Sequence, residues 1–222
     1  MTHLESELQH LKDNLIEMWT LVQNQLTKAK TALITDDKDL AREVISGEKR
    51  VNAFELSIDQ DCENVFALFN PVAVDLRLVL AIIKINNNLE RQGDSAKGIA
   101  QFVIYFDAPF DKKLLAITRI VEMFDENIIM LSELIEAFEK EDGIIARRTF
   151  KRDELLDSIN DETTAVVADY IRNNIDNTEQ ALQILSIIRK LERTGDHSKN
   201  IAEEIIFYTE AKVLKHKKEK TK

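Results

Sequence analysis

The sequence is poor in the residues that interrupt regular structure: its 222 residues include five glycines and two prolines. Average proteins contain about 7% glycine and about 5% proline, so this scarcity excludes collagen-like chains and argues against turn-rich β-sandwiches. The single cysteine, Cys62, cannot form an internal disulfide and fits a reducing cytoplasm. Because no apolar run reaches the roughly 18 residues that span a bilayer, the sequence predicts no transmembrane helix.

The net charge of −10 is distributed unevenly along the chain. Residues 212–222 carry six lysines and one glutamate, which leaves the preceding body with a net charge of −15. Such a body repels nucleic acid phosphates, so nucleic acid is not an expected partner. The basic tail allows at most peripheral contact with an anionic membrane, and a solubilising end is the simpler interpretation. The acidic, polar segment 1–7 is unlike a signal peptide, which also favours a cytoplasmic location.

Apolar residues recur at spacings of three and four, as in Ile82, Ile85 and Leu89, and strand-like alternation is not sustained. The pattern therefore predicts an all-α fold. Helix breaks are expected at Asp36–Asp37, at both prolines and near Gly143, because Asp caps helix starts and residues before proline avoid helical angles. Six long helices are predicted, at 4–33, 37–69, 71–106, 111–139, 142–174 and 176–210.

An internal repeat relates the two halves of the chain. Residues 89–100 (LERQGDSAKGIA) and 191–202 (LERTGDHSKNIA) are identical at eight of twelve positions, at an offset of 102. Further upstream the offset becomes 105, with the length difference near the Pro71 turn, where loops tolerate insertions. The sequence thus predicts two tandem, pseudo-symmetric three-helix bundles, 1–107 and 108–211, followed by the basic tail 212–222. Two separate domains and one fused six-helix body are both compatible with this pattern.

The repeated motif contains two features that a helix ordinarily avoids. Glu90 and Asp94 lie four residues apart, as do Glu192 and Asp196, so each pair shares a helix face and its charges repel. The glycine between them costs about 1 kcal/mol relative to alanine within a helix. Its missing Cβ would allow a neighbouring helix to approach closely, within reach of the acidic pair.

That neighbouring helix offers matching pairs, Glu48/Asn52 in the first half and Asp153/Asp157 in the second. Oxygen ligands from two helices suit a hard cation, which would also offset the repulsion among carboxylates. The predicted metal-binding residues are Glu48, Asn52, Glu90, Asp94, Asp153, Asp157, Glu192 and Asp196. Glu55/Asp59 is a weaker competing pair, since its counterparts are Asn160 and Thr164. The alternative interpretation is a solvated acidic face that Arg91 and Arg193 partly neutralise.

Taken together, these motifs resemble the PhoU family, the phosphate-uptake regulators of bacteria and archaea. The family pattern is a twice-repeated three-helix bundle with Leu-Glu-Arg-x-Gly-Asp on the third helix of each copy. Residues 71–77 (PVAVDLR) resemble the family's Pro-x-x-x-Asp-Leu-Arg segment, which residues 173–179 lack, and Asp196-His197 matches its Asp-His form. The family's metal motif maps onto Glu90/Asp94, Glu192/Asp196 and Asp153/Asp157, whereas Glu48/Asn52 departs from it by an amide.

The resemblance implies a cytoplasmic adaptor rather than an enzyme. It would connect the ATPase subunit of a phosphate ABC transporter with a sensor histidine kinase, act as a homodimer, and restrain phosphate uptake and phosphate-regulon expression. Fe, Zn, Mn or Mg is the implied metal. Two alternatives remain at this stage, a di-iron carboxylate enzyme and a metal-free structural scaffold. The first requires two Glu-x-x-His motifs, of which Glu7–His10 is the one match.

Overall fold

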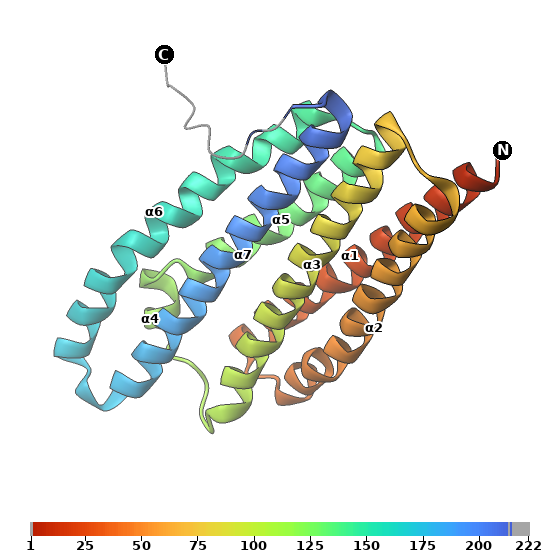
Figure 1. The fold of residues 1–222 in the computed structure, drawn as a ribbon. Coiled ribbons are helices and arrows are strands. Elements are labelled where there is room, and N and C mark those ends of the chain that lie inside the picture. Colours follow the sequence, from red (N-terminus) through yellow and green to blue (C-terminus); the bar gives the residue numbers. More distant parts are fainter. Residues whose placement is uncertain (1, 213, 215–222) are drawn as a thin grey trace, which may run out of the picture.

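Long helices packed side by side make up the molecule (Figure 1). The computed structural model describes residues 2–212 and 214. In this part of the chain the elements are α1 (His3–Thr35), α2 (Lys38–Phe69), α3 (Ala73–Tyr105), α4 (Lys112–Ile117), α5 (Ile120–Glu139), α6 (Gly143–Asn173), the 3-10 turn η1 (Ile175–Asn177) and α7 (Thr178–Glu210). The described residues contain no β-strand, which confirms the all-α prediction.

Most helix boundaries fall where the sequence places caps. Thr2 and Glu5 form a capping box at the start of α1, with the Glu5 amide 3.2 Å from the Thr2 hydroxyl oxygen. The side chains of Asp37 and Asp142 accept hydrogen bonds from backbone amides in the first turns of α2 and α6. Asn70, just before the first proline, ends α2 in the left-handed conformation. Five of the six predicted helices agree with the structure to within two residues at each end.

The prediction of one helix over 111–139 is wrong, because this segment forms two helices, α4 and α5. The chain breaks at Arg119, which has a left-handed φ of 53°. Thr118 and Ile120 on either side are both buried, and residues two apart cannot share one face of a continuous helix. The Arg119 guanidinium binds the Glu122 carboxylate through two hydrogen bonds of 2.7 and 2.8 Å, which helps to hold the turn.

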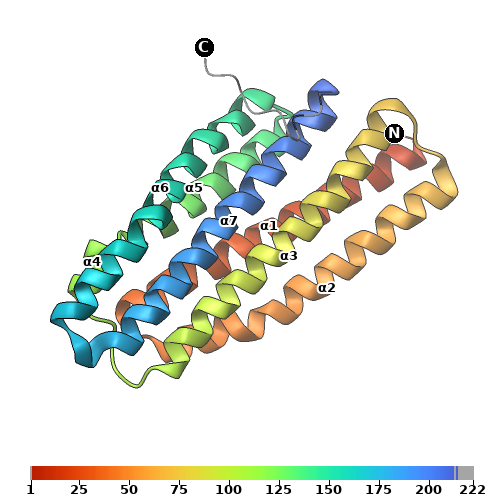
Figure 2. The same ribbon diagram turned by 60° about the vertical axis from the view of Figure 1, so that its left-hand side comes forward.

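The two repeats share one hydrophobic core. In Figures 1 and 2, α3 and α7 lie side by side at the middle of the molecule, with α2 and α6 at opposite edges. The buried Trp19 of α1 packs on Phe138 of α5, with ring centroids 6.1 Å apart, and Phe138 also contacts Tyr208 of α7. Between α3 and α7, the Gln92 amide donates to the Thr194 carbonyl and the Ser198 hydroxyl. Of the two arrangements left open by the sequence, the structure shows the fused body.

The division at 1–107 and 108–211 stays a prediction about the sequence repeat. Apart from Lys212 and Leu214, the predicted basic tail 212–222 lies outside the described residues. Within the described part of the chain, no helix combines the length and the apolarity needed to cross a membrane. Cys62 is fully buried, and burial raises the pKa of its thiol to about 12, so it is a core residue as expected.

Candidate metal centres

The repeated glycines bring the acidic helices together. A Cβ on Gly93 of α3 would lie 3.1 Å from Val51 Cγ1 of α2, tighter than ordinary van der Waals contact. A Cβ on Gly195 of α7 would overlap Leu156 Cδ1 of α6 and lie 3.2 Å from Asp153 Oδ1. The expectation of a close helix approach beside each acidic pair is therefore confirmed.

The first cluster lies between α2 and α3. Glu48 on α2 meets Lys97 on α3, with 2.6 Å between Glu48 Oε1 and Lys97 Nζ, and this ammonium is 3.7 Å from Asp94 Oδ1. The hydrogen bond from Lys97 is the main reason that the pKa of Glu48 is lowered. Burial, followed by the charges of Asp94 and Glu55, raises the pKa of Glu90. Four carboxylates thus influence one another, with Lys97 beside Glu48 and Asp94 and the Arg91 charge acting on the other two, Glu55 and Glu90.

The second cluster repeats this arrangement between α6 and α7. Lys199 Nζ is 2.6 Å from Asp153 Oδ2 and 3.4 Å from Asp196 Oδ1. The Asp153 side chain is 4% exposed, and burial is the largest cause of its raised pKa, opposed by Lys199. Burial and then the charges of Asp196 and Asp157 likewise raise the pKa of Glu192. The structure therefore gathers all four predicted residues of the second half.

Glu55 is a member of the first cluster that the motif comparison ranked low. Burial and the charge of Asp59 raise its pKa, and Asp94 contributes in the same direction. Asp59 itself accepts a 2.9 Å hydrogen bond from Asn86 Nδ2, which ties it to α3. With Glu55 included, the first cluster contains four carboxylates beside the Asn52 amide, the same number as the second. The amide at Asn52 therefore does not leave the first cluster short of acidic groups.

Lys97 and Lys199 are members of the clusters that the sequence interpretation missed. Both stand three residues after the motif aspartate, at the same place in the two copies, so the repeat itself carried the signal. Each ammonium group joins an acid on one helix to an acid on the next. Arg91 and Arg193 also neutralise part of the charge, since Arg91 lowers the pKa of Glu55 and Glu90 and Arg193 that of Glu192, while Arg91 Nε donates a 3.2 Å hydrogen bond to Asn87 Oδ1.

A cation fits the donor chemistry of both clusters, although the side chains are not arranged around one point. In the described chain, no three His, Cys, Asp or Glu side chains already converge as ligands of one ion. Two buried oxygens at these positions, Asn52 Oδ1 and Asp153 Oδ1, nevertheless accept no hydrogen bond. Carboxylate and amide oxygens in need of a positive partner are suitable ligands for hard cations. When bound, a metal would offset the repulsion that raises the carboxyl pKa values.

The raised pKa of Glu192 predicts a distinctive pH dependence. Its folded-state pKa lies above the unfolded value, so the charged carboxylate destabilises the fold at neutral pH, and protonation relieves this as pH falls. We expect metal-free Glu192→Gln to be more stable than wild type at pH 7.5 by about 0.5 kcal/mol, a small value because partly exposed charges are screened. This difference should shrink toward pH 5. Urea unfolding at several pH values measures it.

Other titratable groups beside Glu192 also change the stability with pH, so the free energy of unfolding of the variant must be compared with that of wild type at each pH. Lys199 stays charged over this range, because its pKa is raised. His197, whose pKa is lowered chiefly by burial, has the opposite effect on stability, and subtracting the wild-type curve removes it. The exposed Glu63→Gln is the matched control and should leave the pH dependence unchanged. A Glu192→Gln variant less stable than wild type at every pH would contradict the prediction.

The fold and these clusters define a class: duplicated, all-helical proteins with one acidic cluster in each repeat. A family model described as the PhoU domain matches this chain twice, over residues 15–103 and 120–205. The chain therefore belongs to the PhoU family, as its repeated motif indicated.

Several known proteins are similar along nearly the whole chain. The phosphate-specific transport system accessory protein PhoU homolog 1 of Thermotoga maritima is 30% identical, over 96% of this chain and 91% of the relative. The corresponding protein of Edwardsiella tarda is 32% identical, over 95% of this chain and 86% of its own. These names describe accessory proteins, which agrees with the expectation that the chain is not an enzyme.

Solved structures show the same fold. The crystal structure of PhoU from Pseudomonas aeruginosa matches with a TM-score of 0.89 and 29% identity, covering 95% of this chain and all of that one (100%). The phosphate transport system regulatory protein PhoU from Streptococcus pneumoniae matches with a TM-score of 0.85 and 26% identity, covering 96% of this chain and 99% of that one. The break between α4 and α5 thus lies within an architecture that relatives share.

Proposed function

We propose that this protein is a cytoplasmic negative regulator of phosphate uptake and phosphate-regulon signalling. It acts as a metal-binding, homodimeric adaptor between the ATPase subunit of a phosphate ABC transporter and a sensor histidine kinase. The observation that carries the regulatory role is the match to phosphate-transport accessory proteins over 95% or more of the chain. The two acidic clusters, each with four carboxylates and a buried oxygen without a hydrogen bond, support the metal-binding part.

The clusters suggest how a metal would contribute. In each half, a bound cation would attach the acids of one helix to those of the next, α2 to α3 and α6 to α7. Lys97 and Lys199 already provide such links with a single positive charge each. A divalent ion would neutralise more of each cluster, since its four carboxylates outnumber the one lysine and one arginine beside them.

Capture from phosphate-replete cells tests the adaptor role. The full chain should recover the transporter ATPase and a histidine kinase, and deletion of its gene should raise phosphate-regulon output. Capture of neither partner, together with unchanged regulon output, would sink the proposal. Light scattering of the purified chain measures the homodimer independently.

Elemental analysis of paired variants tests the metal. Glu192→Gln combined with Asp196→Asn removes two carboxylates of the second cluster with little change in shape, so the metal content per chain should fall by about half. Repression of the phosphate regulon should weaken in the same cells. The control combines Glu63→Gln and Glu139→Gln, two exposed acids outside the clusters, and should keep the wild-type content.

A metal-free scaffold is the second candidate, and one observation favours it. Lys97 and Lys199 partly neutralise the clusters within the chain itself. Under this alternative, purified protein contains no stoichiometric metal, and the paired variant changes stability but not metal content. The di-iron enzyme has less support, because His10 of its single motif match contacts Asn14 on the same helix, 3.1 Å away.

A further inference from the structure

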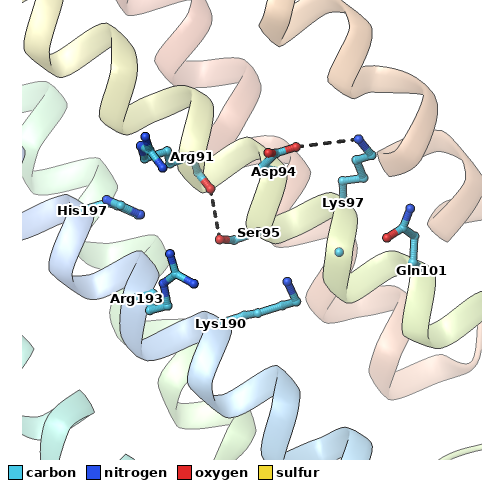
Figure 3. Close-up of a pocket in the computed structure, with 9 residues that line it drawn as sticks. Arg91, Asp94, Ser95, Lys97, Gln101, Lys190, Arg193 and His197 are labelled. Atoms are coloured by element: carbon cyan, nitrogen blue, oxygen red, sulfur yellow. Dashed lines mark hydrogen bonds and ion pairs between the residues drawn. The ribbon is translucent and has the colours of Figure 1, made fainter.

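A basic pocket lies between α3 and α7, where the two repeats meet (Figure 3). Its volume is about 310 Å³, within the range of small-ligand sites. Four cationic side chains line it, Arg91 and Lys97 from α3 and Lys190 and Arg193 from α7. In Figure 3, Lys190 and Arg193 extend from α7 toward α3. A concentration of positive charge is notable in a chain whose net charge is −10.

The positive charge of this pocket is only partly compensated. Among the described residues that line it, Asp94 is the one carboxylate, and it faces Lys97. Lys97 is also bound to Glu48, so its charge belongs mainly to the first acidic cluster. No hydrogen bond or ion pair within the described chain engages the side chain of Lys190 or Arg193. The Thr194 hydroxyl donates to the backbone carbonyl of Lys190, and the Arg193 charge lowers the pKa of Glu192. Two cations therefore remain available to a ligand, with the Arg91 guanidinium as a third.

The glycine at position 98 gives Lys190 its place. A Cβ on Gly98 would lie 2.9 Å from Lys190 Nζ and 3.0 Å from its Cε. The lysine side chain thus lies directly against the α3 backbone, in space that any larger residue would contest. This position directs the ammonium into the groove between the helices.

The internal repeat provides a comparison, because it generates an equivalent position on the other side of the α3–α7 contact. There Asn88 replaces Lys190, and Asn200 replaces Gly98. Asn88 Oδ1 is 3.1 Å from His197 Nδ1 and 3.4 Å from Asn200 Nδ2, so the polar side chains on this side form hydrogen bonds with one another. The basic pocket is therefore present on one side of the α3–α7 contact and not at the repeat-related position on the other side.

We propose that this pocket binds a compact, multivalent oxyanion of the phosphate class. Arginine guanidinium groups bind phosphate oxygens in a bidentate manner, and a lysine ammonium adds a mobile point charge. Ser95 donates its hydroxyl proton to the Arg91 carbonyl at 3.0 Å, so the cationic groups supply the recognition. The ligand is either the free ion or the phosphoryl group of a larger molecule. Of the residues that line the pocket, Asp94 alone is also a proposed metal ligand. The proposal of anion binding does not depend on the proposed adaptor role.

Isothermal titration of the full-length protein at low ionic strength tests the proposal, with inorganic phosphate in one arm and ATP in the other. Binding of either probe is the expected result. Tighter binding of phosphate identifies the free ion as the ligand, and tighter binding of ATP identifies a phosphoryl group. Removing two charge-assisted contacts with Arg193→Gln and Lys190→Asn should weaken the preferred probe at least about tenfold. Higher salt should weaken binding as well.

Arg189→Gln is the matched control, since Arg189 is an exposed neighbour on α7 that does not line the pocket. It should bind like wild type. The pocket variant keeps every carboxylate of both clusters, so anion binding through a cluster metal would survive in it. Thermal unfolding confirms that each variant is folded. Absence of binding of both probes to wild type, equal affinity of the pocket variant, or equal weakening by Arg189→Gln would each overturn the proposal.

Discussion

Replacing Lys199 with methionine is expected to lower the free energy of unfolding of the metal-free protein by about 2–3 kcal/mol. The reason is Asp153, whose side chain is 4% exposed and whose Oδ2 lies 2.6 Å from the Lys199 ammonium. Without the lysine, this carboxylate stays buried beside other acids and has no positive partner. Breaking a buried ion pair costs about 3–5 kcal/mol, and the partial exposure of Lys199 places this case at or below the lower end. Urea unfolding in the presence of a chelator measures the change.

The equivalent substitution in the first half is the matched control. Lys97→Met should cost less, because Glu48 is 14% exposed and hydration replaces more of the lost contact. If a divalent ion binds the clusters, adding it should restore more stability to Lys199→Met than to wild type, since the variant leaves more charge to neutralise. A Lys199→Met variant as stable as wild type without metal would show that the lysine bridge contributes nothing.

Introducing valine at Gly195 is expected to destabilise the protein by about 2–3 kcal/mol, the upper part of the range for overpacked cores. Even its Cβ would overlap the buried Leu156 and approach Asp153 Oδ1 to 3.2 Å. The helix propensity gained on replacing glycine, about 1 kcal/mol at most, offsets only part of this cost. Thermal and urea unfolding measure the effect.

A double-mutant cycle identifies the source of the strain. Leu156→Ala alone leaves a cavity and is destabilising, but it should lower the cost of valine at Gly195 because it removes the overlapping methyl group. Gly93→Ala is the milder comparison, since its Cβ would lie 3.1 Å from Val51, and its net effect should be near zero. Additive costs in the Gly195–Leu156 cycle would contradict a direct clash.

Periodicity and capping residues were sufficient to predict most of the fold. Both prolines lie between helices and Gly143 begins α6, and the capping residues Asn70 and Asp142 stand beside two of these three positions. The repeat also predicted the close approach at Gly93 and Gly195, because a glycine retained within two matched helices requires a packing reason. Apolar spacing alone, however, did not reveal the break at Arg119. That turn depends on the burial of Thr118 and Ile120, which is decided by packing between helices.

The acidic clusters were predicted in outline and incompletely in detail. Spacing along each helix identified the paired acids, but the contribution of Glu55 depends on how α2 is rotated against α3, which a repeat comparison cannot measure. The lysine bridges were visible as matched positions, yet a lysine three residues after an acid is ordinary on a helix surface. The one-sided basic pocket was hidden for a related reason: it arises from differences between the copies, whereas the motif was found through their identities.

The contact between α3 and α7 has a consequence for any shorter form of this chain. Gln92 is buried against Thr194 and Ser198, and Trp19 contacts Phe138, so each repeat covers apolar surface of the other. A three-helix fragment on its own would expose that surface to water, which repeat units generally cannot tolerate. It would have to associate with a second fragment about a two-fold axis. The present single chain thus has the architecture of a symmetric dimer of half-length subunits that are joined covalently. Because the two halves belong to one chain, the two sides of their interface can carry different residues.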